Sequence, residues 1–183
     1  MTHRGRLIAL AGAALVLAAN ITAAQTPQRG GVARLAVIGN PTANLFTTPG
    51  GFTDIVVGKP LFNTLVKYDT KDLGPAPDLA EAWSVSEDQK VWTFRLRKGV
   101  KWHDGAPFTA EDVKFTLDAI MHPCVNAAFR SFLRGLTKTE VVDAHTVRLH
   151  LDAPVGPFLT LLAYNIAIMP KHLLEGKDLN APS

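Results

Sequence analysis

An alternating strand, a tight turn and a capped helix follow one another in the middle of the sequence. Apolar and polar residues alternate from residue 91 to residue 102, as in an antiparallel strand with one buried face. The apolar residues on that face are Trp92, Phe94 and Leu96. Asp104-Gly105 then predicts a tight turn, and Thr109 predicts the cap of a helix that ends at Met121. This succession predicts a mixed α and β protein, not a helical bundle or a pure β-sandwich.

Three further segments extend this expectation. Thr146 to Leu151 also alternates and predicts a second half-buried strand. Pro157 can occupy the first turn of an apolar helix that runs to about Ala163. Asp78-Leu79-Ala80-Glu81 has the spacing of a capping box, which predicts a short helical turn ending near Trp83.

The first 24 residues have the pattern of a secretory signal. Two arginines precede an apolar run from Leu7 to Ala19, and Thr22-Ala23-Ala24 supplies the small residues of a cleavage site before Gln25. As a helix this run would span about 20 Å, less than the roughly 30 Å hydrocarbon core of a bilayer. A buried core helix or a short membrane anchor is the alternative. Because no cysteine lies near the cleavage site, we expect a periplasmic protein without a lipid anchor.

Composition excludes several classes of protein. Hydrophobic residues make up 47% of the chain, which is enough for a core. After residue 24, seventeen basic and sixteen acidic residues remain, so there is no electrostatic case for nucleic acid or an anionic membrane surface. A single cysteine, Cys124, excludes a disulfide-stapled scaffold.

Candidate reactive residues are few. His122 and Cys124 stand two positions apart, and His103 precedes the turn, so a secreted thiol or metal hydrolase is one hypothesis. Nothing near this pair has the pattern of an oriented base or a completed ligand set. A histidine at a helix end and a small structural thiol explain the same residues, and we propose no catalytic residue, metal site or cofactor.

The tract from Pro77 to Met121 resembles the signature of the family 5 extracellular solute-binding proteins, the peptide- and nickel-binding subunits of ABC importers. It contains PDLAEAW at residues 77–83, SED at 86–88 and VWTFRLRKGVKWHDGAPFTAEDV at 91–113. Shorter similarities are LFNTLV at 61–66, VDAHTV at 142–147, the segment 154–162 and PKH at 170–172. Asn63-Thr64 replaces the Glu-Gly that is usual in the family.

The resemblance implies a periplasmic binding protein-like II fold, here incomplete, that carries the extra α/β lobe of the family. By analogy the chain divides into a signal peptide (1–24), the start of lobe I (25–63), the extra lobe (64–165) and a truncated return to lobe I (166–183). The implied protein is a monomer that captures a peptide or similar small polar solute and delivers it to a permease and its ATPases. Nickel or a metal chelate, an opine or an oligosaccharide is the alternative cargo.

The resemblance also indicates where a ligand would be met. The loop Gly50-Gly51-Phe52 lies where lobe I approaches the ligand, and its glycines would expose the backbone to a peptide. Tyr164-Asn165 lies at the lobe crossing, and Phe129 and Arg130 lie near a region that contacts chelates in nickel-binding relatives. The alternatives for these three places are a plain surface turn, hinge packing and a solvated loop.

Overall fold

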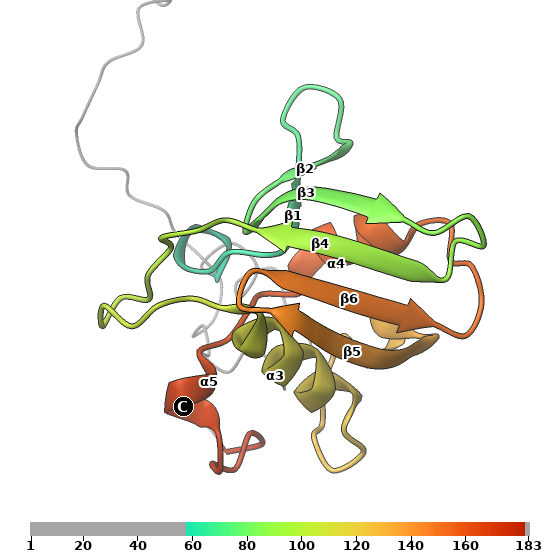
Figure 1. Cartoon of the computed structure of the whole chain (residues 1–183). Helices are drawn as coiled ribbons and strands as arrows, with labels where there is room; N and C mark the ends of the chain where they lie inside the picture. The colour runs from blue at the N-terminus through green and yellow to red at the C-terminus, as the bar shows by residue number, and fades with distance from the viewer. Residues whose placement is uncertain (1–57, 182–183) are drawn as a thin grey trace, which may run out of the picture. The chain divides into compact units, whose positions relative to one another are not determined.

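The computed structural model describes residues 58–181. The predicted signal peptide and the Gly50-Gly51-Phe52 loop lie outside the described residues. Within 58–181 the chain forms an antiparallel four-stranded sheet of order β3-β4-β6-β5, with helices on one side (Figure 1). The strands are β3 (Ala80–Val85), β4 (Val91–Leu96), β5 (Leu136–Asp143) and β6 (Thr146–Leu151). The predicted strand at 146–151 is confirmed as β6. The predicted strand at 91–102 is confirmed only over 91–96, because β4 ends at Leu96 and residues 98–99 form a turn. The mixed α and β class is confirmed with them.

One sequence prediction is wrong, because residues 80–83 are part of strand β3 and not of a helical turn. Trp83 pairs with Phe94 across the β3–β4 ladder. The Asp78 carboxylate does not cap a helix, since it accepts hydrogen bonds from the Asn63 side chain at 2.9 Å and the Thr64 amide at 3.0 Å. Partners distant in the chain therefore override the local capping-box spacing.

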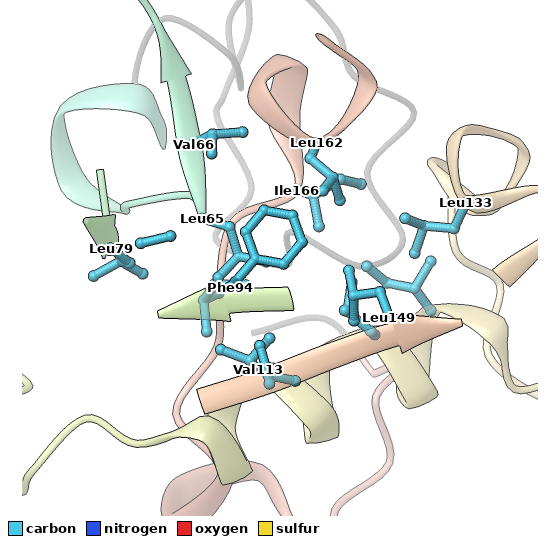
Figure 2. Close-up of a cluster of buried hydrophobic side chains, with 14 of the residues drawn as sticks. Leu65, Val66, Leu79, Phe94, Val113, Leu133, Leu149, Leu162 and Ile166 are labelled. Atoms are coloured by element: carbon cyan, nitrogen blue, oxygen red, sulfur yellow. The ribbon is translucent and has the colours of Figure 1, made fainter. Parts of the chain in front are cut away.

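The inner face of the sheet packs against α3 (Ala110–Met121) and α4 (Phe158–Asn165). The Trp92 and Phe158 rings lie 5.8 Å apart and join β4 to α4. Figure 2 shows Phe94 in the middle of this core, between the sheet and the segments that lie over it. The largest fully buried side chains include Leu65, Phe94, Leu96, Leu117, Leu133, Leu149, Phe158, Leu162 and Ile166.

Helix α3 begins where the sequence predicts. The Thr109 amide donates to Asp112 Oδ2 at 2.9 Å, which is the carboxylate arm of a capping box. Helix α3 ends at Met121, immediately before His122-Pro123. No helix among the described residues has the length and apolar content that a membrane crossing requires.

The remaining elements are short. Strands β1 (Val66–Tyr68) and β2 (Pro75–Pro77) form a hairpin, η2 (Arg130–Leu133) is a 3-10 turn and α5 (Lys171–Leu174) is a single helical turn. The Tyr68 hydroxyl donates to the Thr160 carbonyl at 2.9 Å and ties this hairpin to α4.

The first and last parts of the described chain lie side by side. Thr64 and Ala167 form an antiparallel bridge, and the Ile168 amide donates to the Asn63 carbonyl at 3.0 Å. We call these two segments, residues 63–64 and 167–168, the crossing pair. Helix α3 holds the chain just beyond it, because the Met169 amide donates to Thr116 Oγ1 at 2.9 Å.

Candidate functional site

Three aromatic rings meet where η2 approaches the C-terminal end of α4. Tyr164 lies 6.4 Å from Phe129 and 5.4 Å from Phe132, both edge to face, and Phe129 lies 5.5 Å from Phe132. We call Phe129, Phe132 and Tyr164 the aromatic cluster. Two of the three were predicted as ligand contacts from the sequence, and the fold brings them together.

The aromatic cluster is accessible because of how its elements are built. The turn η2 spaces Phe129 and Phe132 three residues apart, so both rings reach the same side. Tyr164 lies in the last turn of α4 and is 42% exposed, whereas Leu162 and Ala163 beside it are buried. An exposed phenol resting on two half-buried rings offers apolar faces, ring edges and a hydroxyl to a small molecule.

Two polar side chains lie around the end of α4. Burial raises the pKa of Tyr68 above its ordinary value, and the neighbouring Tyr164 adds to this increase. Lys59 Nζ donates to the Ala163 carbonyl at 3.0 Å. Burial lowers the pKa of Lys59, although the charge of Asp78 acts in the opposite direction. The Lys59 ammonium therefore satisfies a carbonyl in the last turn of α4, where carbonyls ordinarily have no partner within the helix.

Arg130, another predicted ligand contact, is hydrogen-bonded to the main chain. Its guanidinium donates to the carbonyls of Ile120 at 2.9 Å and His122 at 2.8 Å, and also to the carbonyl of Val125. The first two carbonyls lie at the C-terminal end of α3, where a cation also complements the helix dipole, and the third lies in the loop that follows. Arg130 therefore does not lie on a solvated loop. Its guanidinium donors Nε and Nη2 are occupied, because they hold η2 against the end of α3.

Replacing Arg130 by methionine is expected to lower the free energy of unfolding by about 1–3 kcal/mol, because three main-chain carbonyls, two of them in partly buried hydrogen bonds, lose a charged donor. The loss should be read from urea unfolding, together with faster hydrogen exchange in the last turn of α3. The Arg134→Met variant, at an exposed arginine just after η2, is the matched control. Equal effects of the two substitutions would contradict the fastening role.

Within residues 58–181, the residues of the hydrolase hypothesis form neither a metal site nor a hydrogen bond between the Cys124 thiol and a histidine. Cys124 is exposed, and its backbone amide, not its thiol, is bonded to His122 Nδ1 at 3.3 Å. Along the chain, His103 lies in the turn before α3 and His122 follows its last residue, so a helix of 12 residues, about 18 Å long, separates them. Between residues 58 and 181, no three His, Cys, Asp or Glu side chains are grouped so that they could hold a metal ion.

The other predicted ligand residues have different outcomes. Asn165 is the last residue of α4. Gly50, Gly51 and Phe52 lie outside the described residues, so they stay predictions. Phe132 was missed by sequence reasoning, although its spacing of three from Phe129 was a usable signal.

The model of the bacterial extracellular solute-binding proteins, family 5 (middle region), matches residues 74–182. The chain therefore belongs to this family of solute-binding proteins. The match includes the whole four-stranded sheet, α3, α4 and the aromatic cluster.

Curated and solved relatives agree with this assignment. The chain is 38% identical over 140 residues to the dipeptide-binding protein of Escherichia coli K12, covering 67% of this chain and 26% of the relative. It is 37% identical over 126 residues to the glutathione-binding protein GsiB of Salmonella choleraesuis, covering 67% of this chain and 24% of the relative. The chain thus spans about a quarter of the length of these curated relatives.

Two solved structures are similar at 36% sequence identity. NikZ from Campylobacter jejuni in complex with Ni(L-His) has a TM-score of 0.62, covering 66% of this chain and 24% of NikZ. AgaA from A. tumefaciens R10 in complex with agropinic acid has a TM-score of 0.67, covering 73% of this chain and 27% of AgaA. The mixed α and β fold of residues 58–181 is therefore one that family 5 binding proteins contain.

Proposed function

We propose that this protein is the substrate-binding component of an ABC importer, which captures a peptide or similar small polar solute and delivers it to a membrane permease. The observation that carries the proposal is the family match, which includes the sheet and α3. The sheet, turn and capped helix then serve as a scaffold, and the solute leaves chemically unchanged.

The crossing pair supports the proposed division into lobes. Residues 25–63 would begin lobe I, residues 64–165 would form the extra lobe, and residues 166–183 would return to lobe I. The bridge between Thr64 and Ala167 lies at both of these boundaries. A lobe inserted into another needs its entering and leaving strands close together, and the crossing pair meets that requirement.

The proposed ligand contacts are Gly50, Gly51 and Phe52 from lobe I, with Phe129 from the start of η2 and Tyr164 and Asn165 from the end of α4. Phe132 joins them as part of the aromatic cluster. Arg130 contributes indirectly, by holding η2, since its donors bind main-chain carbonyls. This lobe would therefore offer a ligand aromatic surface and a hydroxyl.

The relatives indicate the chemical class of the solute that this protein would bind. Dipeptide- and glutathione-binding relatives favour a short peptide. A metal chelate or an opine is the second candidate, because two structures similar at 36% identity hold Ni(L-His) and agropinic acid. Both kinds of cargo are small and polar and suit burial between lobes.

The proposal includes a location and partners. The protein would be exported by its first 24 residues, work in the periplasm as a monomer, and dock on a permease that carries ATPase subunits. A hydrolytic role for Cys124 is not part of the proposal.

Calorimetric titration of the protein expressed from its complete gene tests the site. A peptide should bind with micromolar affinity, and Tyr164→Ala should weaken that affinity about tenfold, as for a central aromatic contact. Thr93→Ala, on the outer face of β4, is the control and should bind normally. Ni(L-His) should be titrated in parallel to identify the second class of cargo. Absence of binding by every peptide and chelate would contradict the function, whereas normal binding by Tyr164→Ala would contradict only the site.

A further inference from the structure

A histidine and a carboxylate connect α5 to the turn at residues 102–106. His172 Nε2 lies 2.7 Å from Asp104 Oδ2, and the His172 ring lies 6.4 Å from the ring of Trp102. Asp104 uses its other oxygen, Oδ1, to accept the Ala106 amide at 3.0 Å. A single carboxylate thus shapes the turn and holds the helix that follows the crossing pair.

We propose that His172, Asp104 and Trp102 form a pH-dependent clasp, which holds α5 against the turn more tightly in mild acid than in mild base. The clasp uses none of the residues of the proposed ligand site.

The direction of the pH dependence follows from the charges of His172 and Asp104. Imidazoles ordinarily gain a proton as the pH falls through about 6.5, and a hydrogen bond between two ions is stronger than one with a neutral donor. The hydrogen bond from His172, and then that from the Ala106 amide, lower the pKa of Asp104 below its ordinary value. A carboxyl pKa that is lower in the folded state stabilises that state at pH values above the pKa. The stabilisation from ionised Asp104 is therefore lost only in strong acid. The clasp is therefore tightest when Asp104 is ionised and His172 is protonated.

The other charged groups on α3 and α5 do not account for a pH dependence in the same range. From α3, Glu111 accepts Lys171 Nζ at 3.0 Å and Asp112 accepts the Lys171 amide at 2.9 Å. From α5, Glu175 lies 3.8 Å from Lys171 Nζ. Carboxyl and ammonium groups ordinarily change charge outside the range from about pH 5.5 to 8. The hydrogen bond from Lys171 to Glu111 raises the pKa of Lys171 further. His103 is a second imidazole in the same turn that takes no part in the clasp, so it provides the matched control.

Hydrogen exchange of the full chain at about pH 5.5 and about pH 8 tests the clasp. The probes are the amides of Leu173 and Glu175, which donate to the carbonyls of Pro170 and Lys171. After correction for the intrinsic exchange rate, their protection should be about two- to fivefold greater at the lower pH. Amides of β4 and β6 report global opening and serve as the reference.

Three variants decide the outcome. His172→Gln keeps an uncharged donor and should abolish the pH difference, and so should Asp104→Asn, which retains an acceptor for Ala106. His103→Gln should leave the difference intact. The proposal is overturned if the wild-type protein shows no difference, if His172→Gln or Asp104→Asn retains it, or if His103→Gln removes it.

Discussion

Replacing Phe94 by alanine is expected to lower the free energy of unfolding by about 3–5 kcal/mol. The Phe94 ring is fully buried in the centre of the core, between β6 on one side and the segments that carry Leu65 and Ile166 on the other (Figure 2). Removing the ring loses its transfer free energy and leaves a cavity, which close-packed neighbours on separate segments cannot fill. A domain is ordinarily stable by about 5–15 kcal/mol, so this one change would remove a large fraction of the stability.

Urea unfolding followed by tryptophan fluorescence measures this loss. Thr93→Ala is the control, since Thr93 is next in the strand but on the outer face, and it should cost less than about 1 kcal/mol. A Phe94→Ala variant that unfolds at the wild-type urea midpoint would show that the core does not depend on this ring.

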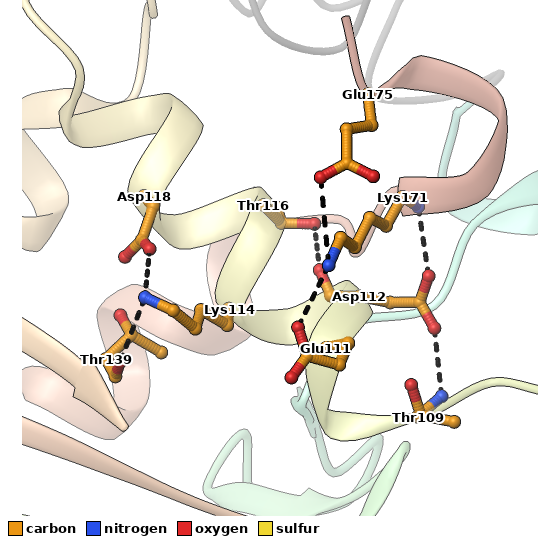
Figure 3. A network of polar contacts seen from close by, with 9 residues as sticks. All are labelled: Thr109, Glu111, Asp112, Lys114, Thr116, Asp118, Thr139, Lys171 and Glu175. Carbon is orange, nitrogen blue, oxygen red and sulfur yellow. Dashed lines mark hydrogen bonds and ion pairs between the residues drawn. The ribbon is translucent and has the colours of Figure 1, made fainter. Parts of the chain in front are cut away.

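Replacing Asp112 by alanine is expected to cost about 2–4 kcal/mol, because two backbone amides would lose their acceptor together. Asp112 is 4% exposed, and its two oxygens accept the Thr109 amide at the start of α3 and the Lys171 amide at the start of α5 (Figure 3). The substitution therefore removes the helix cap and detaches the segment that follows the crossing pair.

Asp112→Asn and Asp118→Ala separate these effects. Asparagine retains one carbonyl oxygen, so it should lose about half as much stability as alanine. Asp118 lies on the exposed face of α3 and pairs with Lys114, so its loss should cost only a few tenths of a kcal/mol. Thermal unfolding ranks the three variants, and an Asp112→Ala variant no less stable than Asp118→Ala would disprove the bridging role.

The regular elements of the lobe were predictable because their causes are local. The alternation in β4 and β6 follows from a pleat that turns successive side chains to opposite faces. The start of α3 was predictable because Thr109 and Asp112 satisfy each other three residues apart. Even the Asp104-Gly105 turn is local, since Gly105 takes a φ of 90° that glycine adopts without strain.

The candidate site was predictable only in part. Tyr164 and Phe129 were indicated by resemblance, but nothing near either residue shows that their rings lie 6.4 Å apart. The role of Arg130 was missed because its acceptors lie five to ten positions earlier and face it only after η2 packs against the end of α3.

By itself, then, the sequence determined the strands β4 and β6, the helix α3 with its cap, and the family of the protein. Those features depend on side-chain periodicity and on partners within a few residues. The tertiary structure alone decided that residues 80–83 form a strand, that Asp112 joins two helices, and that three aromatic rings meet at the end of α4. Each of these depends on groups far apart in the chain, whose pairing is set by the folded core rather than by spacing.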